Sequence, residues 1–362
     1  MEVTLSWQFR ALALTTVIAW PLTQSGLAQG TRPTVLQVQV ENFVNYYNDV
    51  TDWSKLAKNP NATPPAGSVP NFALSLDVAD IVSVNGDPAK GVFTERRIQY
   101  KRTVTPTPGQ FIADSVSSAI QDRYFEILKA DGTPIGSIAV TGMGGAVPAP
   151  GTPSVIADGN FTIVGGTGAF MGARGQAGGL DEPSATGARS ASMTEDPSYR
   201  RALPSGHRLM VLQIIPLERP EVVLTANGPA VVHSSDFSLV ATAKPAKAGE
   251  ILSLIATGLG PTQTPCPSTG GTGGTAGTTC TGVTVVEPGD PFPAAPLALV
   301  NSPVSVTVGG QPAEVLYAGG YPGTTDTYQV NFRMPAGVPS GAASLQVSAA
   351  WIAGSAVSIA AQ

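Results

Sequence analysis

The chain has 362 residues, only 12% of them are charged, and the formal net charge is −5. Glycine (41 residues) and proline (32 residues) are too frequent for a helical protein, and they favour short strands joined by tight turns. The negative charge leaves no basic face for a polyanion, so we expect no nucleic-acid partner. The two histidines, His207 and His233, lie far apart, and we therefore expect no metal site, no cofactor and no histidine-based catalytic triad.

Residues 1–28 are predicted to be a signal peptide. Arg10 provides a positive charge, the run from Ala11 to Trp20 is apolar, and Gly26-Leu27-Ala28 places small residues where a signal peptidase cuts. The apolar run is too short to span a bilayer, and no later stretch reaches about 20 continuous apolar residues. We expect cleavage after Ala28 and export of a chain without a transmembrane segment; the alternative is an uncleaved membrane anchor.

Strand candidates follow from residue 35 onward. Apolar and polar residues alternate over 35–41, with Leu36, Val38 and Val40 on one face. Turn signals such as Asn85-Gly86 and Asp131-Gly132 separate later candidates. About eight short strands without a convincing helix predict an antiparallel barrel over residues 29–217, with loops over 45–70 and 178–206. The further strand candidates of this part are 72–84, 92–104, 119–129, 135–142, 161–165 and 208–216.

A second run of strands follows the proline-flanked boundary at residues 216–220 and predicts a sandwich over residues 218–362. Within it, Cys266 and Cys280 flank a loop rich in glycine and threonine. In an oxidising compartment such a pair is expected to form a disulfide, which would contribute roughly 3 kcal/mol by closing this loop. The strand candidates are 251–256, 283–286, 304–308, 314–317, 328–332 and 343–347.

The most specific stretch of the sequence is Gly165-Gly166-Thr167-Gly168, followed by Phe170 and by Gly172-Ala173-Arg174-Gly175. It resembles the strand–turn–strand signature of allene oxide cyclases and dirigent proteins. Upstream, residues 122–126 and 138–142 are similar to the two preceding strands of that family. The resemblance covers about residues 33–217 and implies an eight-stranded antiparallel barrel whose interior holds one small apolar ligand.

The same glycines can also be compared with a dinucleotide-binding loop, because a strand precedes them. Such a loop needs a helix after it, whose N-terminus binds the phosphates. The residues that follow, Met171 to Gly179, are too rich in glycine to begin a stable helix. We therefore reject the dinucleotide reading.

Three blocks in the second half of the chain, 249–261, 303–315 and 328–337, resemble the C-terminal domain of many exported acidobacterial proteins, which is itself similar to immunoglobulin-like IPT/TIG modules. The resemblance spans about residues 220–362. It implies an immunoglobulin-like β-sandwich used for display, spacing or attachment, and a secreted or surface-associated bacterial protein. It carries no catalytic residue.

Allene oxide cyclases use a first-strand glutamate and a tyrosine after the Val-x-Gly strand to assist cyclisation of an unstable epoxide. Glu41 lies where the resemblance places that glutamate. After Val140-Thr141-Gly142, however, the tyrosine position falls near Gly144, so the tyrosine is absent. This departure argues against that particular reaction.

Asp77, Arg123, Tyr124 and Glu126 are further candidates. Asp77, Tyr124 and Glu126 are predicted to bind the ligand, and the last two are also candidates for catalysis. Tyr124 and Glu126 share one face of a strand, while Arg123 and Phe125 share the other. If the Tyr124 face lines the lumen, Glu126 is a carboxylate in an apolar cavity with a raised pKa and can act as an acid or a base. The alternative, which we favour, is an outward Glu126 paired with a neighbouring cation.

Three functions are compatible with this sequence. The barrel binds a small apolar molecule and the sandwich displays it; or the barrel is an isomerase or cyclase acting on such a molecule; or the lumen is filled and the protein is structural or adhesive. The first is our prediction, and whether the protein is an enzyme is left open. The barrel wall can also support a homo-oligomer.

Overall fold

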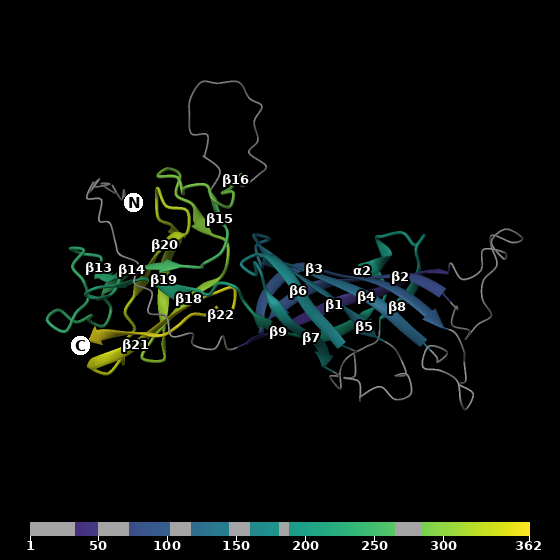
Figure 1. The fold of residues 1–362 in the computed structure, drawn as a ribbon, viewed down its shortest axis with the longest axis horizontal. Coiled ribbons are helices and arrows are strands. Elements are labelled where there is room, and N and C mark those ends of the chain that lie inside the picture. The colour runs from purple at the N-terminus through teal and green to yellow at the C-terminus, as the bar shows by residue number, and fades with distance from the viewer. Residues whose placement is uncertain (1–32, 50–71, 102–116, 145–159, 181–187, 265–283) are drawn as a thin grey trace, which may run out of the picture. The chain divides into compact units, whose positions relative to one another are not determined.

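The computed structural model describes residues 33–49, 72–101, 117–144, 160–180, 188–264 and 284–362. These residues are almost entirely in β-strands, arranged as a closed barrel and a second, curled sheet. Figure 1 draws the strands of the barrel in purple to teal and those of the second sheet in green to yellow. The predicted signal peptide, and Cys266 and Cys280 with their predicted disulfide, lie outside the described residues.

Eight antiparallel strands close the barrel, because β1 pairs with both β2 and β9. A ninth strand, β8 (Arg189–Ser192), pairs in parallel with the last part of β1. The predicted short strands are in fact long; β1 alone has 16 residues. In the order in which they pair, the barrel strands are β1 (Thr34–Asp49), β2 (Phe72–Val84), β3 (Asp87–Lys101), β4 (Ser117–Lys129), β5 (Pro134–Gly144), β6 (Asn160–Gly168), β7 (Arg174–Leu180) and β9 (Gly206–Ile215).

The lumen of the barrel holds an apolar core built from the inward side of every strand. Phe93, Phe125 and Phe43 form its centre, with ring centroids 5.0 Å apart for Phe93–Phe125 and 5.8 Å apart for Phe43–Phe93. Such tilted and edge-to-face contacts stabilise a core beyond the burial of apolar area. The side chains of Phe161, Ile127, Ile138 and Leu212 complete it.

A β-bulge in β1 changes which residues of this strand face the lumen. Its pairing with β2 shifts by one residue between Glu41 and Val44, and Asn42 there adopts a positive φ of 53°. Before the bulge Val40 is buried in the core, and after it Phe43 and Asn45 are buried instead. An extra residue in one strand produces this change of face, and bulges often lie beside functional sites.

The second sheet is also antiparallel, and a second cluster of buried apolar side chains comes from strands on its central path and off it. Its central path joins β10 (Glu221–Val222), β14 (Ile251–Thr257), β20 (Thr327–Arg333), β19 (Gln311–Gly320), β17 (Leu299–Val300), β15 (Thr262–Thr264) and β16 (Thr284–Val285). Off this path lie β13 (Val231–His233), β18 (Val304–Val308), β21 (Gly341–Ala349), β22 (Ile352–Ala353) and β23 (Val357–Ala361). A separate hairpin consists of β11 (Leu224–Thr225) and β12 (Gly228–Pro229).

The predicted loops are partly wrong. Residues 45–49 continue β1, and the segment 178–206 contains the end of β7, the strand β8 and the short helix α2 (Tyr199–Ala202). The predicted Asn85-Gly86 turn between β2 and β3 is confirmed, with φ values of 52° and 86° that suit a two-residue hairpin of type I′. After the glycine-rich motif the chain continues as β7, not as a helix.

Gly175 on β7 is expected to tolerate no side chain. Its φ is 146°, and an added Cβ would lie 1.9 Å from the carbonyl oxygen of Gln213 on β9. We expect Gly175→Ala to lower the free energy of unfolding by roughly 2 kcal/mol or more, through backbone strain and overpacking. Gly178→Ala, where nothing lies within 4 Å, should change it by less than about 0.5 kcal/mol. Urea unfolding of both variants tests this, and equal effects would contradict it.

Candidate functional site

A row of polar side chains crosses four neighbouring strands inside the barrel. Asn45 on β1 lies opposite Asp77 on β2, and Asp77 lies opposite Glu95 on β3. Arg123 on β4 follows opposite Glu95. Two residues further along β2 lies Ala79, a member of the apolar core, so the period-two alternation of the strand directs Asp77 into the lumen as well. All four polar side chains are buried.

Hydrogen bonds join the members of this row. The Nδ2 of Asn45 donates to the Oδ1 of Asp77. The Nε of Arg123 donates to the Oε2 of Glu95 at 2.6 Å, while Arg97 donates from Nη2 to the Oε1 of Glu95 at 2.7 Å. Arg97 Nη2 also lies 3.5 Å from the Oδ2 of Asp77. The carboxylate of Glu95 is therefore held between two guanidinium groups.

A second polar row lies beside the first, toward the ends of β1 and β3. Ser75 on β2 lies opposite Arg97 on β3, and Arg97 lies opposite Gln121 on β4. The Nη2 of Arg123 donates to the Oε1 of Gln121 at 3.2 Å and so connects the two rows. We call these seven residues the polar cluster: Asn45, Ser75, Asp77, Glu95, Arg97, Gln121 and Arg123.

Aromatic rings of the core support the charged groups in the lumen. The Cζ of Arg123 lies 3.6 Å from the ring centroid of Phe161 on β6. Arg208 on β9 lies over the ring of Phe43, with 5.2 Å between its Cζ and the centroid. A guanidinium over an aromatic face is attracted to the ring, most strongly where water is excluded. These contacts place the polar cluster directly against the apolar core.

The carboxyl group of Asp77 has a strongly perturbed pKa. Burial raises this pKa, and the nearby carboxylate of Glu95 raises it further. The guanidinium groups of Arg97, Arg123 and Arg208 act in the opposite direction, and the pKa of Asp77 stands at about 7. A carboxyl group with this pKa is present in both protonation states near neutral pH, so it can donate or accept a proton or a hydrogen bond.

The polar cluster lies toward one particular end of the barrel. There β1 and β3 end while β2 and β4 begin, and residues 50–71 and 102–116 connect them. At the opposite end the chain turns within two residues between β2 and β3. Binding sites in β proteins gather at the end of the scaffold that carries the longer connections. The cluster thus lies at the end where a ligand site is most often built.

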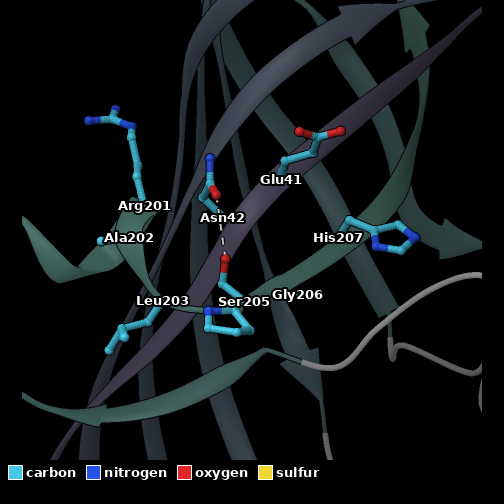
Figure 2. A pocket seen from close by; sticks show the side chains of 9 residues that line it. Glu41, Asn42, Arg201, Ala202, Leu203, Ser205, Gly206 and His207 are labelled. Carbon is cyan, nitrogen blue, oxygen red and sulfur yellow. Dashed lines mark hydrogen bonds between the residues drawn. The ribbon is translucent and has the colours of Figure 1, made fainter.

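A groove of about 410 Å³ opens beside the bulge of β1, where β1 separates from β9. Figure 2 shows Glu41, Asn42, Ser205 and His207 lining it, and the ring of His207 points away from Ser205. The hydroxyl of Ser205 donates to the Oδ1 of Asn42 at 3.5 Å, and no hydrogen bond between Ser205 and His207 occurs among the described residues. Serine, histidine and glutamate thus share this groove without the contacts of a catalytic triad.

Asp80 on the outer face of β2 holds the wall of this groove in place. Arg200 on α2 donates to Asp80 at 2.6 Å, and its neighbour Arg201 donates to both carboxylate oxygens at 2.8 Å. Burial by itself would raise the pKa of Asp80, but the hydrogen bonds from Arg201, Arg200 and Asn42 outweigh it and lower the pKa to about 2. These contacts anchor α2, and we assign them a structural role.

The structure separates the residues that the sequence singled out. Asp77 lies in the lumen within the polar cluster. Glu41 is exposed and lines the outer groove. Tyr124 and Glu126 are both exposed on the outer face of β4, with Tyr124 donating to the Oγ of Ser137 at 2.8 Å. The face of β4 that carries Arg123 therefore lines the lumen. Glu126 points outward, which is the orientation that we favoured from the sequence.

Arg123, a candidate of the sequence analysis, also lies in this cluster, whereas its remaining members were missed by sequence reasoning, although a signal for two of them exists. Glu95 and Arg97 alternate with Phe93 on β3, so an inward Phe93 implies that both charged residues are inward. Such a pattern is ordinarily read with the charges outside, because charged residues are seldom buried.

His233, in the second sheet, pairs with a carboxylate 17 residues further along the chain, at 2.6 Å between its Nδ1 and the Oε1 of Glu250.

Comparisons with protein-family models, with curated proteins and with solved structures found no match to this chain. Among the helices of the described residues, none has the length and apolar character needed to cross a membrane. No cluster of three or more His, Cys, Asp or Glu side chains suited to a metal ion occurs in the described part of the chain. The functional argument therefore rests on the geometry of the lumen.

Proposed function

We propose that the barrel binds one small, mainly apolar molecule in its lumen, with a polar group of that molecule against the polar cluster. The observation that carries this proposal is the burial of the ions of the cluster: Asp77 and Glu95 are each 1% exposed, and Arg123 is 5% exposed. Buried ion pairs add little stability, and well-packed apolar residues are often as stable or more so. Charged side chains buried beside an apolar core are typical of functional sites, and so are groups with a perturbed pKa.

The proposal favours the lumen over the outer groove for a physical reason. Polar groups that line an open groove remain in water and cost little, so they need no functional explanation. The ions of the lumen are desolvated, and their retention does require one. A filled lumen with a purely structural role remains the competing function, and it predicts that no ligand is bound.

Native mass spectrometry of the full chain purified from its own host tests this proposal. We expect a bound small molecule at one per barrel, or its uptake from a library of lipophilic compounds. Asp77→Asn, which changes the cluster with little change of shape, should weaken binding about tenfold or more, as expected when a hydrogen bond to a charged or polar partner is lost. Glu126→Gln on the outer face of β4 is the matched control and should bind as the wild type does. Bare protein throughout would contradict the proposal.

A second candidate function, an isomerase or cyclase, is favoured by one observation, the pKa of about 7 for Asp77. A carboxyl group whose pKa lies near the pH at which the protein works suits general acid–base catalysis. An isomerase converts its substrate into a product of equal mass. On incubation with the protein, we therefore expect the bound compound to change its chromatographic retention while its mass stays constant. Asp77→Asn should stop this conversion.

Our proposal extends to the finer assignments. Kinship with allene oxide cyclase and dirigent barrels is supported by the glycine motif at the end of β6, and an immunoglobulin-like display module by the blocks of the second sheet. Export through residues 1–28 belongs to the same proposal. Exposed apolar side chains on the barrel wall, Leu76 and Tyr124 among them, support a homo-oligomer.

A further inference from the structure

Two polar atoms of the polar cluster have no hydrogen-bond partner. They are the Oδ1 of Asn45 and the Oγ of Ser75, and each has less than 1 Å² of accessible surface. Asn45 uses its Nδ2 for Asp77, so its oxygen is the atom left over. Buried polar atoms without a partner are rare in proteins, and each calls for an explanation, such as a functional role or a bound water or ion.

The two side chains lie on the same inward side of the β1–β2 pair. Asn45 faces Asp77 across the β1–β2 pair, and Ser75 precedes Asp77 by two residues on the same inward face of β2. Asn45 and Ser75 are therefore diagonal neighbours on one side of an antiparallel pair. The backbone positions of such neighbours are about 7–8 Å apart, a separation that one ligand hydroxyl can bridge between the two side chains.

The chemistry of the two atoms selects the kind of group. An amide oxygen such as Oδ1 of Asn45 only accepts hydrogen bonds, while the hydroxyl of Ser75 can donate one. A ligand hydroxyl fits both at once, because it donates its own hydrogen to Asn45 and accepts from Ser75. An ether oxygen or a carboxylate satisfies Ser75 but leaves the oxygen of Asn45 unpaired.

The arginines of the polar cluster do not change the preference for a ligand hydroxyl over a carboxylate. Arg123 is already bonded to Glu95 and Gln121, and Arg97 is bonded to Glu95. The acceptor capacity that remains unused belongs to Asn45. An anion placed beside its oxygen would also lie near Asp77, whose charged form would repel it, while Arg97, Arg123 and Arg208 act on the same carboxyl group in the opposite direction.

We propose that the ligand of the lumen is a neutral, mainly apolar alcohol, whose hydroxyl donates to the Oδ1 of Asn45 and accepts from the Oγ of Ser75. This inference rests on the proposed binding function and specifies its ligand class. Leaving a buried acceptor unpaired costs enough to weaken binding by about tenfold to hundredfold. The alcohol should therefore be preferred over its methyl ether by that factor.

Binding of three probes of equal chain length to the full chain tests this inference: 1-octanol, its methyl ether and octanoate, measured by native mass spectrometry and calorimetry. We expect 1-octanol to bind at least about tenfold more tightly than either of the others. Asn45→Leu should make 1-octanol and its ether bind equally. Ser75→Ala, a smaller change that is safe for folding, should weaken 1-octanol by about threefold to tenfold. Thr162→Val, at an exposed position of β6, is the control and should change none of the affinities.

Each outcome decides a different point. Equal affinity for the alcohol and the ether in the wild type overturns the alcohol assignment, since a buried water then satisfies Asn45, and leaves lumen binding standing. If octanoate binds most tightly, the alcohol assignment is also overturned, and the arginines of the polar cluster bind an anionic ligand instead. No binding of any probe overturns the alcohol assignment and, together with bare protein in the native spectrum, the binding function itself.

Discussion

Replacing Glu95 with alanine is expected to lower the free energy of unfolding by about 3–5 kcal/mol. The side chain is buried and accepts hydrogen bonds from Arg123 at 2.6 Å and from Arg97 at 2.7 Å. Without it, Arg123 is a buried cation with no carboxylate at hydrogen-bond distance among the described residues, and the loss of its counter-ion is the largest part of the cost. Urea unfolding followed by circular dichroism measures the effect.

Two further variants separate the ion pair from the simple loss of a side chain. Glu126→Ala removes an exposed glutamate on the adjacent strand β4 and should change the free energy of unfolding by less than about 0.5 kcal/mol. The double variant Glu95→Leu, Arg123→Leu removes the buried pair together and should be clearly less unstable than Glu95→Ala. The single variants Glu95→Leu and Arg123→Leu complete the comparison. If the double variant loses as much stability as the two single variants together, the two side chains are not coupled.

The stability of the protein is expected to fall with rising pH because of Asp77. Its pKa is about 7 in the folded protein, against an ordinary value of 3.8. Between these values the folded state holds a proton that the unfolded chain has released, so the free energy of unfolding decreases as the pH rises. The stability that is present below the ordinary pKa is lost by the time the pH passes the folded pKa. For a shift of this size the loss approaches about 4 kcal/mol.

Asp77→Asn should remove this pH dependence. We expect the wild type to lose up to about 4 kcal/mol more than the variant between about pH 4 and about pH 8, measured by urea unfolding at a series of pH values. Asp131→Asn is the matched control: its hydrogen bond from the amide of Thr133 lowers the pKa of Asp131, so its titration lies below this window. Parallel pH curves for the wild type and Asp77→Asn would refute the assignment.

The sequence predicted those strands whose alternation and flanking turns can be recognised from neighbouring residues alone. The bounds of β2 and β18 agree with the predicted ranges, and the Asn85-Gly86 hairpin was read from the two residues that favour its turn. β7 was missed, because Gly175, Gly178 and Gly179 have low strand propensity and are held as a strand only by pairing with β6 and β9. β8 was missed for a similar reason, since its four residues pair with β1 far away in sequence.

The orientation of β2 shows most directly what local alternation does not decide. Leu76 and Val78 alternate with Ser75 and Asp77, and such a pattern is normally read with the apolar residues inside. In the structure Ser75 and Asp77 are the buried pair, and Leu76 is 37% exposed. The partners of Asp77 come from β1, β3 and β4 and meet it only inside the closed barrel, so no local pattern contains this information.

By itself, the sequence determined that the chain is nearly all-β, because turn residues and period-two alternation act over a few neighbouring positions. Closure of the barrel, the bulge at Asn42 and the choice of lumen face were decided by the tertiary structure. They depend on pairing between strands distant in the chain and on the combined burial of six polar side chains. The charged groups among them can be buried only together, since each compensates the charge of another.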